Sequence, residues 1–275
     1  ITEALHYLAC DVEMNRHVEW LGTFWSHAVA PSTPIPDLVL QISAWQHQFA
    51  DLFGDRALQR VRGFSLPEMH LPNHPDTLFA LVNGLLEAGY RWLLVQEHSV
   101  EQLDGSPLSG PQRFVPNRLI ARSTSGDEAS ITALIKTQGS DTKLVGQMQP
   151  TEEALGLGRQ RLGSAEIPAL VSQIADGENG GVMMNEFPEA FRQANHHIRD
   201  SKAPTSALNG SEYLEQLDAL GVNWGDLPQI QAVHQHRLWQ RAGDSSDGDS
   251  IVESIAELSN ANDGFSMEGA SWTNN

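Results

Sequence analysis

Apolar residues recur along this 275-residue chain with two different spacings, and each spacing predicts a different element. Spacings of three and four positions predict a helix over residues 1–20 and another after a proline-rich loop. The second helix is expected to begin near Asp37, whose carboxylate is the predicted N-cap, and to end at Gly54. A third helix is predicted from Pro75 to Gly89, because glycine is typical of a helix C-terminus.

Short apolar runs without a helical period predict strands. Residues 58–66 form one such run and residues 91–98 the next, and the helix between them completes a strand–helix–strand unit with a right-handed parallel crossover. Residues 117–138 indicate two short strands joined by the turn 123–128. Residues 167–181 indicate a strand that runs into a glycine-rich turn.

The rest of the chain continues the alternation of strands and helices. Further helices are predicted at 151–163, 187–200, 210–221 and 249–259. This order indicates an α/β fold with a parallel sheet, either closed as a barrel or open. An α/β barrel of ordinary size would use nearly all of the chain, so we expect one domain over residues 1–275. The acidic stretch 243–250 is expected to be a surface loop within it.

Charge and cysteine content narrow the classes of partner. The chain has 35 acidic and 17 basic residues, a formal net charge of -18, which repels nucleic acid and anionic membrane surfaces and favours a neutral or cationic ligand. The single cysteine, Cys10, cannot form an intrachain disulfide, and the sequence has no CxxC pair for a zinc site, so a reducing, cytoplasmic compartment is expected. No apolar run reaches the roughly 20 residues that span a bilayer.

Acidic residues stand at the predicted strand ends, where parallel α/β folds place their functional groups. Glu68 follows the first strand, Glu97 and His98 follow the second, and Asp176 and Glu178 follow a later one. Two carboxylates on either side of a glycosidic bond can cleave it without a metal or a cofactor. One attacks the anomeric carbon and the other protonates the leaving oxygen. The alternative is that each acid is solvated or caps a helix.

Aromatic side chains are also expected in a carbohydrate-binding site, because the apolar faces of sugar rings stack on flat side chains. Most such residues serve only the core of a protein. The candidates in this chain are Trp20, Phe24, Trp25, Trp92, Trp224, Trp239 and Trp272.

Three sequence blocks in order resemble the signature blocks of glycoside hydrolase family 57. They are "EWLGTFWSHAVAP" (19–31), "GFSLPEM" (63–69) and "ADGENGG" (175–181). The resemblance implies a (β/α)7-type barrel of parallel strands, with helices following the barrel core. It also implies a retaining mechanism on α-glucans or maltooligosaccharides, as in the amylases, 4-α-glucanotransferases and branching enzymes of that family.

The resemblance also implies roles for single residues. Glu68 matches the nucleophile and Asp176 the acid/base, while His27 matches a histidine that contacts the sugar or orients the nucleophile. The other residues expected to bind substrate are Trp25, Glu97, His98, Glu178 and Trp272.

Two departures from the family pattern change the expectation. The family's N-terminal "HQP" block is absent, so the chain is expected to begin after the first barrel strand and to be a fragment. Ser65 stands where the family often has a bulky aromatic residue, which affects the choice of substrate.

Two other functions compete with this interpretation. A metal-dependent polysaccharide deacetylase would use His70 and His74 as ligands, but Pro72 disfavours the helix that would bring them to one face. The pairs at 196–197 and 234–236 lie in predicted helices where neighbouring side chains diverge, so no metal is expected. A non-catalytic glucan-binding protein is the third possibility, with glucan affinity and no turnover.

Overall fold

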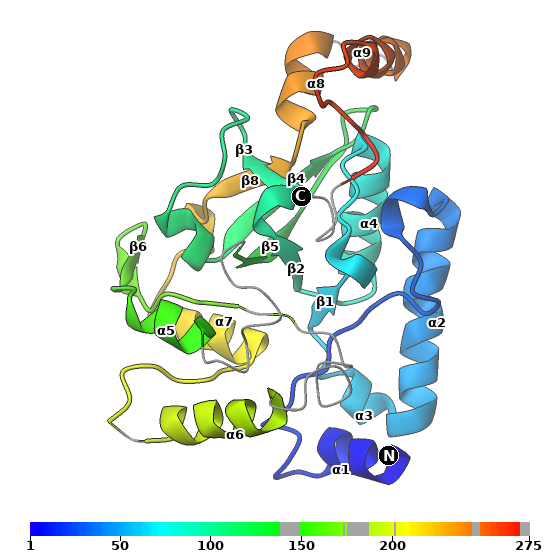
Figure 1. The fold of residues 1–275 in the computed structure, drawn as a ribbon. Helices are drawn as coiled ribbons and strands as arrows, with labels where there is room; N and C mark the ends of the chain where they lie inside the picture. Colours follow the sequence, from blue (N-terminus) through cyan, green and yellow to red (C-terminus); the bar gives the residue numbers. More distant parts are fainter. Residues whose placement is uncertain (138–148, 173, 175–186, 201, 244–247, 270–275) are drawn as a thin grey trace. The chain divides into compact units, whose positions relative to one another are not determined.

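The computed structural model describes residues 1–137, 149–172, 174, 187–200, 202–243 and 248–269 (Figure 1). Its contacts divide the chain into two compact units. The first unit comprises residues 1–108, 117–133 and 228–275, and the second comprises 109–116 and 134–227. The prediction of one domain over 1–275 stays a prediction.

The first unit contains most of a six-stranded sheet with the order β1-β2-β5-β4-β8-β3. The strands are β1 (Gly63–Ser65), β2 (Trp92–Gln96), β3 (Val100–Gln102), β4 (Asn117–Arg122), β5 (Glu128–Lys136) and β8 (Gln229–Ala232). The pairs β1–β2 and β4–β8 are parallel, whereas β4–β5 and β3–β8 are antiparallel. The sheet is therefore mixed. The hairpin predicted at 117–138 is confirmed by the pair β4–β5, whereas the prediction of a parallel sheet is wrong for the pair β3–β8. The turn 123–127 is too short for a parallel crossover, so β4 and β5 must run in opposite directions.

Helices pack on this sheet and on one another. They are α1 (Thr2–Cys10), α2 (Ile35–Phe53), α3 (Asp55–Leu58), α4 (Pro75–Glu87), α8 (Gln235–Ala242) and α9 (Gly248–Asn260). The predicted crossover β1–α4–β2 is confirmed, because Phe64 of β1 pairs in parallel with Leu93 of β2. Helix α4 lies beside α2 (Figure 1), and Leu78 and Leu85 of α4 and Ile42 of α2 are buried.

Two predicted boundaries in this unit are wrong for local reasons. The first helix ends at Cys10 and not near residue 20, because the Asp11 carboxylate accepts the backbone N–H groups of Glu13 and Met14 and so competes with the helical bonds. Asp37 is not the N-cap of α2, which begins earlier after Pro34. The Asp37 carboxylate lies instead in the first turn, where the helix dipole favours an acid.

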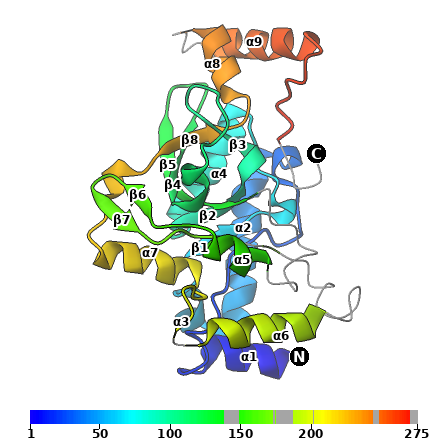
Figure 2. The same ribbon diagram turned by 60° about the vertical axis from the view of Figure 1, so that its left-hand side comes forward.

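The second unit has a small core of its own. Its elements are α5 (Gln149–Leu155), β6 (Gln160–Leu162), β7 (Ala165–Ile167), α6 (Phe187–Ile198) and α7 (Gly210–Ala219). The β6–β7 hairpin lies beside α7 (Figure 2). The buried core of the second unit is formed by Val115, Leu162, Ile167, Tyr213, Leu217, Val222 and Leu227.

Helix α5 is shorter than the predicted helix at 151–163. It ends at Leu155, where Gly156 and Gly158 favour termination, and the following residues form the β6–β7 hairpin around Gly163, whose φ is 57°. The strand predicted at 167–181 can be compared only in part, because residues 173 and 175–181 lie outside the described part. Within it, Ser172 forms one parallel bridge with Lys136.

The acidic stretch 243–250 differs from the predicted loop at its end. Residues 248–250 form the first turn of α9, where Asp249 lies at the favourable end of the helix dipole, and residues 244–247 lie outside the described part. Among the described residues, no helix combines the length and the apolar character needed to cross a membrane.

Candidate active site

The candidate site begins where the chain adds a short extended segment to the edge of β1. The backbone N–H of Gly22 donates to Gly63 O, and Ser65 N–H donates to Gly22 O, each at 2.9 Å. Both glycines are needed for close approach, because a methyl group at Gly22 would overlap the Tyr90 phenol and one at Gly63 would overlap the Trp92 indole. Tyr90 is 2% exposed, and burial raises the pKa of its hydroxyl well above the ordinary value. A buried aromatic layer therefore supports the start of the site.

The segment after Gly22 is held on α2 by one glutamine. Gln41 accepts the N–H of Trp25 at its backbone carbonyl, and its side-chain oxygen accepts the N–H and the hydroxyl of Ser26. The Trp25 residue is 52% exposed, and the His27 side chain is 71% exposed. Gln41 was not among the candidate residues, since a polar position in an amphipathic helix carries no sequence signal for such a contact.

Glu68 follows the carboxyl end of β1 in an unusual backbone conformation. Its φ is 55° and its ψ is 14°, and the next residue, Met69, has a φ of 47°. Non-glycine residues in this left-handed region cost about 1–3 kcal/mol each and persist only where the surroundings hold them. Here the flanking residues Leu66, Pro67 and Met69 are buried, while the Glu68 side chain remains 38% exposed. The turn thus exposes the Glu68 carboxylate to solvent while its neighbours in the sequence are buried.

His27 contacts this carboxylate directly. Its Nε2 lies 3.0 Å from Glu68 Oε1, and since the carboxylate oxygen accepts, Nε2 carries the proton. His27 also has a positive φ, of 57°. Two left-handed residues 41 positions apart in the sequence therefore meet through their side chains, an arrangement that fixes one carboxylate oxygen in place.

The second predicted group of strand-end residues lies at the same edge of the sheet. Because β1 and β2 are parallel and in register, with Ser65 beside Leu94, their carboxyl ends are neighbours. Glu97 and His98 form a short 3-10 turn directly after β2 and are partly buried. The structure thus brings Glu68, Glu97 and His98 to one edge.

Three other predicted site residues are Asp176, Glu178 and Trp272, and they lie outside the described residues. Gly269, the last described residue, donates its N–H to the Asn73 side-chain oxygen at 2.8 Å. Asn73 is 1% exposed and also donates to the carbonyls of Val233 and Ser266. The described chain therefore ends against the loop that begins at Glu68.

The histidines weighed as metal ligands have other partners or positions. The ring nitrogens of His70, His234 and His236 face the backbone carbonyls of Glu268, Ser266 and Leu103. His74 is the residue before the first turn of α4. Within the described ranges, no three histidine, cysteine or acidic side chains are grouped so that they could hold a metal ion.

The aromatic candidates divide by burial. Phe24 and Trp92 are buried in the core, and Trp20 stacks on Phe53. Trp224 donates to Asp218. Trp25 and Trp239 keep accessible surface, Trp25 near His27 and Trp239 on α8.

The fold is similar to that of two solved structures. The 4-α-glucanotransferase from Thermococcus litoralis aligns with a TM-score of 0.55 and 17% identity, over 95% of this chain and 35% of that one. The α-amylase AmyC from Thermotoga maritima aligns with a TM-score of 0.56 and 12% identity, over 97% of this chain and 60% of that one. No protein-family model and no curated protein sequence matches the chain.

These similarities concern the fold. At such identities they confirm the resemblance to glycoside hydrolase family 57 at the level of the fold. The chain spans 35% and 60% of the length of the two structures that it matches. Closure of the sheet into a seven-stranded barrel stays a prediction.

Proposed function

We propose that this chain carries the site of a retaining enzyme that acts on α-glucans or maltooligosaccharides, by hydrolysis or by glucanosyl transfer. The observation that carries the proposal is Glu68, an accessible carboxylate at a strand end, fixed by His27 at 3.0 Å and presented by a left-handed turn. Such strain is concentrated at functional sites, where the geometry of a reactive group must be fixed in advance. The two glucan-acting enzymes with a similar fold support the choice of substrate.

The proposed reaction uses two carboxylates. A Glu68 oxygen attacks the anomeric carbon and forms a glycosyl ester, while Asp176 gives its proton to the leaving oxygen. Water or a sugar hydroxyl then attacks the anomeric carbon and gives its proton to Asp176. The bond between this carbon and the Glu68 oxygen breaks, which restores the Glu68 carboxylate. His27 holds Glu68 Oε1 through its Nε2–H, so we assign it a positioning role. Trp25 would offer its exposed indole to a sugar ring, and Glu97, His98, Glu178 and Trp272 remain proposed substrate contacts. The proposed framework is a (β/α)7-type barrel of the family 57 kind over residues 1–275.

The first test is Glu68→Gln, assayed with maltoheptaose. An amide cannot form the glycosyl ester, so turnover should be abolished while the folded protein is retained. The matched control is Glu253→Gln on the exposed side of α9, which should keep full activity. Activity of Glu68→Gln equal to that of the control would remove Glu68 as the nucleophile.

The products of the wild-type reaction test the substrate assignment. Shorter maltooligosaccharides would identify hydrolysis, longer ones disproportionation, and new α-1,6 links branching. If maltoheptaose binds and no product forms, the chain is a glucan-binding protein and the catalytic proposal fails.

A further inference from the structure

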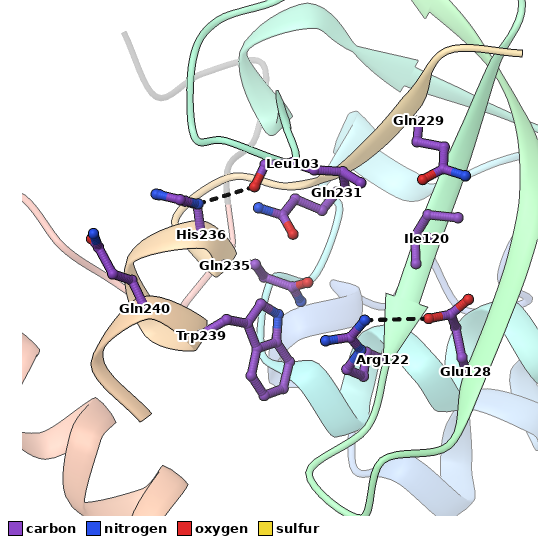
Figure 3. Close-up of a pocket in the computed structure, with 10 residues that line it drawn as sticks. All are labelled: Leu103, Ile120, Arg122, Glu128, Gln229, Gln231, Gln235, His236, Trp239 and Gln240. Atoms are coloured by element: carbon purple, nitrogen blue, oxygen red, sulfur yellow. Dashed lines mark hydrogen bonds and ion pairs between the residues drawn. The ribbon is translucent and has the colours of Figure 1, made fainter. Parts of the chain in front are cut away.

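A pocket of about 410 Å³ lies in the first unit between β8, the β4–β5 hairpin and α8 (Figure 3). It shares no lining residue with the group formed by His27, Glu68 and Glu97. Its volume falls within the roughly 300–1,000 Å³ of small-molecule sites. Nothing in the proposed reaction uses this pocket, so its chemistry is argued separately.

Two buried glutamines fix the polarity of the pocket wall. Gln231 is 6% exposed and its Nε2 donates to Glu101 Oε1 at 3.0 Å, whereas Gln235 is 1% exposed and its Nε2 donates to Asn73 O at 3.0 Å. A carboxylate and a carbonyl can only accept, so the orientation of both amides is determined. Within the described part of the chain, neither side-chain carbonyl oxygen has a hydrogen-bond donor of its own. The wall therefore offers two fixed acceptors to a ligand that carries hydroxyl donors.

An indole forms the apolar part of the pocket. Trp239 on α8 lies beside Arg122 of β4, whose guanidinium carbon is 5.8 Å from the ring centroid, and Arg122 pairs with Glu128 at 3.5 Å (Figure 3). The guanidinium and the indole are thus held in mutual contact, and the charges of Arg122 and Glu128 compensate one another. Ile120 adds a second apolar surface.

We propose that this pocket is a second carbohydrate-binding site that takes a neutral sugar ring. The ring would place its apolar face on Trp239 and donate hydroxyls to the oxygens of Gln231 and Gln235. Fixed carbonyl acceptors and a chain charge of -18 disfavour a phosphate or carboxylate ligand. The neutral-sugar class follows from the pocket itself, whereas the choice of an α-glucan rests on the proposed function.

The experiment measures the binding of maltoheptaose to the Glu68→Gln protein by isothermal titration calorimetry, so that turnover does not interfere. Trp239→Ala should weaken one binding event by at least about tenfold, or ~1.4 kcal/mol. Tyr7→Ala is the matched control, because Tyr7 on α1 is a 54% exposed aromatic residue that does not line the pocket, and it should leave binding unchanged. Glucose 6-phosphate, the anionic probe, should bind the pocket less tightly than glucose.

A second pocket variant is needed in case Trp239→Ala does not fold. Gln229 and Gln240 are exposed at the pocket rim, so the double change Gln229→Ala/Gln240→Ala should preserve the melting temperature and weaken binding several-fold. Unchanged stoichiometry and affinity in both pocket variants would overturn the proposal. A raised KM for maltotriose in otherwise wild-type Trp239→Ala protein would also overturn it, because the pocket would then belong to the cleft of Glu68. Loss of turnover in Glu68→Gln tests the enzyme proposal independently.

Discussion

Replacement of Glu101 tests how the N-terminus of α8 is held. Glu101 is 7% exposed, and its two oxygens accept the side-chain N–H of Gln231 at 3.0 Å and the backbone N–H groups of His234 at 3.0 Å and His236 at 2.7 Å. The two backbone groups belong to the first turn of α8, which no helical carbonyl can satisfy. The carboxylate therefore acts as a cap supplied by a different part of the chain.

The magnitude follows from the donors that Glu101→Ala would leave without an acceptor. A buried N–H without a partner costs about 1–3 kcal/mol, so the two backbone groups together give roughly 2–6 kcal/mol. We expect about 3 kcal/mol, because water entering from the pocket side would reach part of the turn. Glu101→Gln keeps one acceptor oxygen but turns an NH2 group toward a donor, and it should cost about 1.5–3 kcal/mol.

The assay is urea unfolding followed by tryptophan fluorescence, with the free energy of unfolding obtained from the midpoint and the slope. The control Glu253→Ala removes an exposed carboxylate from α9 and should stay within about 0.5 kcal/mol of the wild type. The expected order of stability is control, then Glu101→Gln, then Glu101→Ala. A Glu101→Ala midpoint equal to that of the control would refute the argument that this carboxylate holds the helix end.

Two further predictions concern the candidate active site. His27→Ala should lower kcat with little change in KM, because it releases Glu68 Oε1 without removing a substrate-binding surface, and His27→Gln should restore part of kcat by keeping a donor; equal kcat values for both variants would contradict the positioning role. Gly22→Ala should destabilise the protein by about 1–3 kcal/mol through overlap with Tyr90. The control Gly158→Ala meets no atom within 4 Å, and a thermal melt that ranks the two equally would contradict the close packing at Gly22.

Much of the first unit could be predicted because its signals are local. The crossover from β1 through α4 to β2 follows from an apolar run, a proline at a helix start and a second apolar run, all within 40 consecutive positions. β2 is buried along its whole length, as the unbroken run 92–95 predicts. The β4–β5 hairpin was likewise predictable, because the turn 123–128 contains the glycine, serine and aspartate typical of turns.

The elements that were missed depend on distant partners. β8 has only four residues, two of them glutamine, and it becomes a strand because β4 and β3 pair with it on either side. The β6–β7 hairpin has three residues in each strand, too few for a period-2 pattern to be distinguished. Mixed pairing across β3, β8 and β4 therefore could not be derived from any one stretch of the sequence.

The strand-end positions of three candidate residues were predictable, and the local geometry was not. Strand-end placement selected Glu68, Glu97 and His98, and the structure brings them to one edge of the sheet. The left-handed backbone of Glu68 has no sequence signal, since it depends on buried residues around the turn. The contact with His27 was expected only from the family resemblance, as one of two roles for that histidine.

The contrast between Glu68 and Glu101 explains why acidic residues alone do not identify a reactive site. The oxygens of Glu101 are occupied by three donors, and its burial leaves no path for a substrate, so it can only hold structure. The Glu68 side chain is 38% exposed, and His27 Nε2 holds its Oε1 at 3.0 Å. A nucleophile needs such an arrangement, with enough contacts to fix its position and enough accessible surface for an anomeric carbon to approach. Accessibility at a fixed position, more than the presence of a carboxylate, is therefore what makes Glu68 the candidate.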